Sequence, residues 1–176
     1  IGLKLDAYCN CLYGHAHHIR MEHPVFNGPF PVKMTIKMEE TPEAGKRMYY
    51  PFGERGVAPD SLPMWQVQKR SYLTHPGMCV GLITHPGGLE DSPEAEFISG
   101  GVSAKGLHAV AIGRHGNFLH WGFAASPDDM TDEAKNVFAN AIVYISQFTG
   151  QTPIARKYRG MGTREFVGWN AFNSSD

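Results

Sequence analysis

The side chains best suited to chemistry gather near the start of the chain. Two thiols and four imidazoles lie within fifteen residues: Cys9, Cys11, His15, His17, His18 and His23. Zinc and copper prefer thiolate and imidazole ligands, and a tetrahedral site needs only four of them. In an extended strand, Cys9 and Cys11 face one side, as do His15 and His17. The six residues are therefore candidate ligands of a transition metal.

The spacing of these residues leaves other interpretations open. Cys-x-Cys differs from the Cys-x2-Cys knuckle of structural zinc sites, and no second ligand pair follows at the usual distance. On the simplest alternative, the cysteines are small buried side chains and the histidines line a loop. On another, His17 and His18 form an active-site pair that acts on a bound substrate.

The elements that must position these groups are clearest between residues 107 and 150. Apolar residues predict strands over 108–112 and 118–123, and residues 113–117 supply the Gly and Asn that a tight reversal needs. Apolar residues then recur at helical spacing over 131–148, from Ala134 to Phe148 with Ile142 among them. Acidic residues and a threonine mark the start of this helix, and Gly150 marks its end.

Weaker patterns complete the expected architecture. Strands are predicted over residues 1–8, 32–38, 47–50 and 64–72. The acidic segment 90–96 is expected to be a solvated loop, and Gly100-Gly101 a turn. We expect an α+β fold, or a truncated α/β fold, in which a mixed, mostly antiparallel sheet is covered by the 131–148 helix. Residues 1–150 would form one domain and 151–176 an extended tail.

Composition bounds the class of protein. The chain has 176 residues, 42% of them hydrophobic, which is enough for one domain with a real core. Its net charge of −1 gives no support for nucleic-acid binding, and no apolar run is long enough to span a membrane. Three cysteines are too few for a disulfide scaffold. The chain begins at Ile1, so an export signal could already have been removed, and the compartment stays open.

Three segments in order resemble the later part of trehalose-utilisation-like domains, which belong to the class I glutamine amidotransferase-like superfamily. They are His23-Pro24-Val25-Phe26-Asn27-Gly28, the hairpin with Gly113-Arg114-His115-Gly116, and the helix containing Ala141-Ile142-Val143-Tyr144-Ile145. The first half of that family, its doubly wound βα units, has no counterpart here. The resemblance implies an α/β or α+β fold and a link to carbohydrate metabolism, and it carries over no catalytic residues.

Three hypotheses follow from these observations. The first is a carbohydrate-associated domain, hydrolytic or non-catalytic, with candidate ligand-binding residues His15, His17, His18, Arg114 and His115. The second is a zinc- or copper-binding protein that uses the segment 9–23. The third is a structural subunit without catalysis that binds a larger protein partner.

Overall fold

The computed structural model describes residues 12–46, 58–70, 81–84, 89, 93–103, 107 and 109–152. The strands predicted at residues 1–8 and 47–50 lie outside these ranges, as do Cys9, Cys11 and residues 153–176 of the expected tail.

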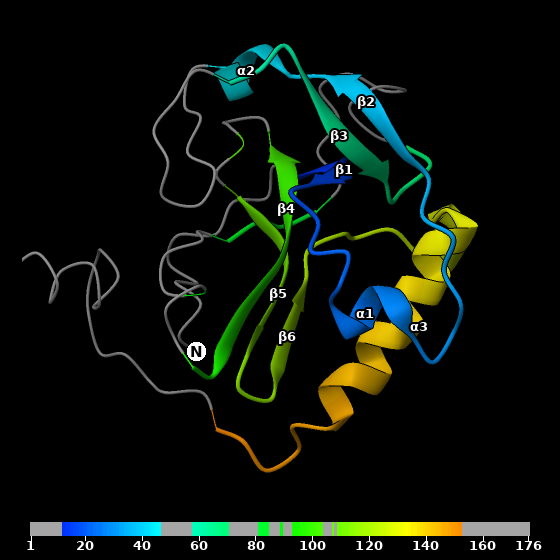
Figure 1. The fold of residues 1–176 in the computed structure, drawn as a ribbon, viewed down its shortest axis with the longest axis vertical. Coiled ribbons are helices and arrows are strands. Elements are labelled where there is room, and N and C mark those ends of the chain that lie inside the picture. The colour runs from blue at the N-terminus through cyan, green and yellow to red at the C-terminus, as the bar shows by residue number, and fades with distance from the viewer. Residues whose placement is uncertain are drawn as a thin grey trace, which may run out of the picture.

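The described strands form one six-stranded sheet in the order β2-β3-β1-β4-β5-β6, and each neighbouring pair is antiparallel. The strands are β1 (Leu12–His17), β2 (Ile36–Glu40), β3 (Ser61–Gln66), β4 (Ala95–Ser103), β5 (Val110–His115) and β6 (Phe118–Trp121). In Figure 1, β2 and β3 lie at one end of the sheet, and α1 (Pro24–Asn27) packs beside α3 (Asp132–Ser146). The predicted α+β fold, with an antiparallel sheet and a closing helix, is confirmed.

Helix α3 fits the helix predicted over 131–148. The Thr131 hydroxyl oxygen accepts a hydrogen bond from the backbone N–H of Ala134, which satisfies one of the open donors of the first turn. One expectation is wrong, because Ile142 is 55% exposed. The buried face is centred on Val137 and Ala141 and continues through Tyr144, so that Ile142 points away from the sheet.

The central strands β1, β4 and β5 are buried on both faces of the sheet. The face toward α3 carries the main core, which includes Ala16, Trp65, Val67, Ile98, Ile112, Val137 and Ala141. The opposite face carries a second cluster made of Tyr13, Ala58, Leu62, Met64, Val102 and Leu107. Side chains alternate along β1, since Ala16 pairs with Trp65 while His17 pairs with Met64. His17 therefore lies on the face away from α3.

The predicted hairpin is present, but its turn is shorter than expected. Strand β5 continues through Gly113, Arg114 and His115, and only Gly116 and Asn117 reverse the chain. Gly116 has φ 58°, in the left-handed region that glycine tolerates. Within this longer strand, Arg114 contacts Glu96 and His115 contacts Glu94.

The largest error of the sequence prediction concerns β4. Residues 95–103 form the longest of the described strands, so Glu96 is not in a solvated loop and Gly100-Gly101 is not a turn. Gly101 lacks a side chain because a Cβ there would lie 2.5 Å from Leu12 Cδ1 and 2.7 Å from Ala111 Cβ.

The strands at the other end of the sheet are displaced from their expected positions. β2 begins four residues later than the predicted strand 32–38, and β3 ends at Gln66 rather than at residue 72. Two short elements, α2 (Glu43–Lys46) and a 3-10 turn at Pro127–Asp129, complete the described part of the chain. None of the helices described is long and apolar enough to cross a membrane.

Candidate functional site

Strand β1 ends in a histidine whose ring is enclosed by the sheet. His17 is 1% exposed and lies opposite Gly100 of β4. Its Nε2 atom lies 3.2 Å from the carbonyl oxygen of Gly101. Because a carbonyl oxygen can only accept, Nε2 carries the proton of the neutral ring. Nδ1 of His17 is therefore a lone-pair acceptor.

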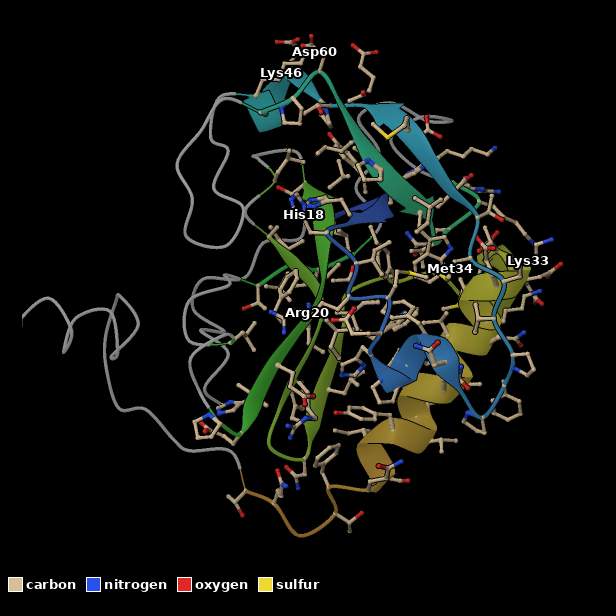
Figure 2. All side chains as sticks on the ribbon, viewed as in Figure 1. His18, Arg20, Lys33, Met34, Lys46 and Asp60 are labelled. Atoms are coloured by element: carbon tan, nitrogen blue, oxygen red, sulfur yellow. The ribbon has the colours of Figure 1, made fainter. Side chains whose placement is uncertain are left out.

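The ring of the next residue points at that acceptor. Nδ1 of His18 lies 2.6 Å from Nδ1 of His17, and the two ring planes meet at 80°. Consecutive residues of a regular strand point to opposite faces. His18 has φ 47°, in the left-handed region, which ends the alternation and brings both rings to one side. Figure 2 shows His18 just beyond β1 and close to β4.

Burial keeps both imidazoles uncharged at neutral pH. Loss of solvation lowers the pKa of His17 to about 3, helped by the neighbouring His18 and opposed by the Gly101 carbonyl. Burial also lowers the pKa of His18. The short contact is thus a hydrogen bond between two neutral rings, in which the Nδ1–H of His18 donates to Nδ1 of His17.

A glycine in β4 makes room for this arrangement. A Cβ on Gly100 would lie 2.7 Å from Cε1 and 2.9 Å from Nδ1 of His17. Distances this short essentially do not occur, so any other residue at this position would displace the imidazole. Gly100 and Gly101 together give the ring its space and its hydrogen-bond acceptor.

A third histidine lies on the same side of β1. His15 pairs with Gln66 of β3 and is 2% exposed. Burial lowers the pKa of His15 to about 4, so this ring is also neutral at pH 7. The structure therefore brings His15, His17 and His18 together on one side of the strand, as strand alternation predicts for the first two.

His23 does not join them. It begins α1, where its Nδ1 atom accepts a hydrogen bond from the backbone N–H of Val25. Its ring packs edge-on against Tyr144 of α3, at 4.7 Å between centroids, and its Nε2 atom lies 3.5 Å from Oε2 of Glu96. His23 thus belongs to the α3 side of the sheet, opposite the His17 ring.

Arg114 belongs to a polar cluster on that same side. Its Nε donates to Oε2 of Glu96 at 2.7 Å, and its guanidinium lies 3.9 Å from the centre of the Phe148 ring. The Tyr144 hydroxyl donates to the same Glu96 oxygen at 2.7 Å. Burial alone would raise the pKa of Glu96, but His23, Arg114 and Tyr144 lower it to about 2. The hydrogen bonds of Arg114 and Tyr144 to Glu96 therefore connect β5 and α3 to β4.

His115 forms a separate pair. Its Nε2 atom lies 3.1 Å from Oε1 of Glu94, and the ring is almost fully buried. His115 pairs with Ala95, whereas His17 pairs with Gly100. Five residues of strand separate the two positions, roughly 15 Å. The five candidate carbohydrate contacts are therefore divided among three places, and the carbohydrate hypothesis stays a prediction.

The candidate metal ligands are divided as well. His15, His17 and His18 lie on one side of β1, His23 lies across the sheet, and the two cysteines are outside the described ranges. Within the residues that the structure describes, no group of three or more His, Cys, Asp or Glu side chains is arranged to hold a metal ion. The best-defined pair is His17 and His18.

Sequence reasoning missed the two residues that organise the polar cluster, Glu96 and Tyr144. Glu96 follows other acidic residues, a composition typical of a loop, and Tyr144 was counted simply as part of the closing helix. One signal was available, since Arg114 lies in a strand next to glycine and would need an anionic partner if buried.

The chain matches no protein-family model, no curated protein and no solved structure.

Proposed function

We propose that this protein binds a transition-metal ion, zinc or copper, with Nδ1 of His17 and Nδ1 of His18 as two of its ligands. One observation carries the proposal: the Nδ1 atoms of two neutral imidazoles on consecutive residues lie 2.6 Å apart. Neutral imidazole nitrogen is a good ligand for both metals.

The surroundings of His17 match those of a metal-binding histidine. Such histidines commonly donate their other ring N–H to a carbonyl or carboxylate, which fixes the tautomer and the orientation of the ring. Here Nε2 of His17 faces the Gly101 carbonyl oxygen at 3.2 Å. The burial that lowers the pKa of His17 to about 3 also keeps protons from competing with a metal.

The backbone conformation of His18 also supports a metal-binding role for the histidine pair. The left-handed conformation of His18 costs about 1 kcal/mol for a residue with a Cβ. Residues in this conformation cluster at active sites and ligand sites, where other interactions maintain them. Here its effect is to bring two side chains together that a regular strand would separate.

Metal binding requires a small change in geometry. Two nitrogens at the usual zinc distance of about 2.0–2.1 Å, in a tetrahedral site, lie about 3.3 Å apart. The rings would therefore separate by less than 1 Å, and His18 would move its proton from Nδ1 to Nε2. Zinc would need two further ligands; the remaining candidates are His15 and, from the sequence, Cys9 and Cys11.

A shared proton is the alternative explanation of the short contact. In that case the pair is a hydrogen bond between two neutral rings, and no metal is needed. Elemental analysis of the purified protein, without chelators, distinguishes the two. About one zinc or copper per chain supports the proposal. Protein that is folded, contains less than about a tenth of an atom per chain and does not take up added Zn²⁺ or Cu⁺ would refute it.

Matched variants locate the ligands. His17→Ala and His18→Ala should each lower metal affinity by at least about tenfold in competition with a chromophoric chelator. The control is His23→Asn, because asparagine keeps the helix cap and His23 lies across the sheet. It should bind metal like the wild type. Cys9→Ser and Cys11→Ser then test whether the thiolates take part.

A further inference from the structure

Strand β2 forms one edge of the sheet. It pairs with β3 on one side, and among the described residues no strand pairs with its other side. Its register with β3 runs from Ile36 to Glu40 without a shift, and four of the five residues are exposed. Natural proteins protect such edges with short strands, charged side chains, prolines, bulges or covering loops, because the open N–H and C=O groups can pair with another chain. β2 is short and carries charges of both signs, which repel in some pairing registers and attract in others. Figure 1 shows β2 along the outer margin of the fold.

The hydrogen-bond pattern shows which groups of β2 point outward. The backbone N–H of Thr41 donates to the carbonyl oxygen of Asp60 at 2.8 Å. These two residues form the next opposed pair after Glu40 and Ser61, the last pair of β2 and β3. Opposed residues of an antiparallel pair alternate between bonded and non-bonded. Lys37 and Glu39 are then bonded to β3, while Ile36, Met38 and Glu40 direct their backbone groups away from it.

The residue across from Met38 agrees with this assignment. It is Pro63, which has no N–H to donate. Proline is tolerated there because Met38 and Pro63 form a non-bonded pair. The outward groups of β2 are therefore those of alternate residues, centred on Met38.

The side chains of β2 match a second copy of themselves. If two β2 strands pair antiparallel about a two-fold axis at Met38, Lys37 of each copy lies opposite Glu39 of the other. These are non-bonded pairs, in which side chains approach most closely, so the opposite charges attract. All five residues pair, and about six backbone hydrogen bonds form.

Neighbouring registers are less favourable. An axis at Lys37 places two lysines opposite each other, and an axis at Glu39 places two glutamates opposite each other, each of which is destabilising. The register centred on Met38 also brings the two Met38 side chains together. Met38 is 63% exposed in the single chain, the highest value among the large hydrophobic residues that the structure describes.

We propose that β2 is an association surface through which two copies of this chain pair edge to edge into a continuous sheet. Charge complementarity favours a second copy as the partner, because among these antiparallel registers the one centred on Met38 places Lys37 opposite Glu39. The interface is one short strand wide, so the association is weak and depends on protein concentration.

Sedimentation of the full chain in low salt, over micromolar to millimolar concentration, tests the pairing. The wild type should shift from monomer to dimer. Lys37→Glu and Glu39→Lys should each raise the dissociation constant by about tenfold or more, because each creates two like-charged pairs per dimer. The double exchange, Lys37→Glu with Glu39→Lys, should restore dimerisation.

Two further variants test the backbone. Met38→Pro removes an outward N–H and no bond to β3, so it should abolish the dimer while circular dichroism stays unchanged. Met38→Ala keeps that N–H and should weaken the dimer only modestly. A wild type that stays monomeric at millimolar concentration overturns the proposal. So does a dimer that survives Met38→Pro, or one that the single charge exchanges leave unchanged, since a different surface would then be responsible.

Discussion

Tyr144 of α3 and Glu96 of β4 are joined by a 2.7 Å hydrogen bond, in which the phenol donates to a carboxylate oxygen that also accepts from Arg114. This contact connects the closing helix to a central strand through a charged group. Hydrogen bonds to charged groups are stronger than those between neutral groups, and a partly buried carboxylate is costly to leave without donors.

Removing the phenol tests how much the contact stabilises the fold. Tyr144→Phe should lower the free energy of unfolding by about 1–2 kcal/mol, because the ring remains and only the hydrogen bond to a carboxylate is lost. Urea denaturation measures this. The control is Val143→Ala, next in sequence and 39% exposed, which should change stability by less than about 0.5 kcal/mol. Equal effects of the two substitutions would show that the hydrogen bond contributes little.

Acid should weaken the same cluster. The pKa of Glu96 is about 2 in the folded chain, below its ordinary value of 4.5, so the unfolded chain binds this proton more readily. The stabilisation is complete above pH 4.5 and is lost as the pH falls toward 2. Glu96→Gln should therefore flatten the dependence of stability on pH in that window, as urea melts between pH 2 and 6 would show. Parallel wild-type and variant curves would contradict this assignment.

Gly100 should be indispensable to the histidine pair. Gly100→Ala places a methyl group 2.7 Å from the His17 ring, so we expect a loss of about 1–3 kcal/mol in stability and a displaced imidazole. Chelator competition should show weaker metal binding by the variant if His17 is a ligand. Gly150→Ala is the matched control, because no atom lies within 4 Å of a Cβ at that position. Normal stability of the Gly100 variant would mean that the strand backbone shifts to admit the methyl group.

The parts of the fold that could be predicted from sequence are those specified by local signals. Helix α3 has a cap at Thr131, an acidic first turn and a helical apolar period, all within a short stretch. The hairpin around Gly116 has a turn residue between two apolar runs. Neither needs information from distant residues.

The candidate site depends on distant residues, which is why its geometry was missed. Leu12–His17 is a central buried strand, although it contains a glycine and two histidines, which have little intrinsic preference for strands. Its placement comes from packing between β3 and β4. The contact of His17 with His18 requires that His18, which is not a glycine, adopts the left-handed backbone conformation. No sequence rule predicts this conformation for a residue at the end of a strand.

Asn140 offers the clearest test of a buried polar contact in α3. It is fully buried, its amide N–H donates to the carbonyl of Phe30, and its amide oxygen accepts from the N–H of the same residue. The Asn140 amide thus bonds both backbone groups of Phe30, as a residue of a neighbouring strand would. It holds the segment between α1 and β2 against the helix. Asn140→Ala should cost about 2–3 kcal/mol, because two hydrogen bonds are lost and the backbone groups of Phe30 lose their partner.

The matched control lies one turn earlier on the same helix. Asn136 also bonds to this segment, through the carbonyl of Pro31 at 3.1 Å, but it does so at an exposed position. Water can replace that bond, so Asn136→Ala should cost less than about 0.5 kcal/mol in the same urea melts. Hydrogen exchange should show the N–H of Phe30 losing protection in the Asn140 variant and keeping it in the Asn136 variant. If both amides were equally dispensable, α3 would be held to this segment by apolar packing alone, and burial would not be what makes the Asn140 contact strong.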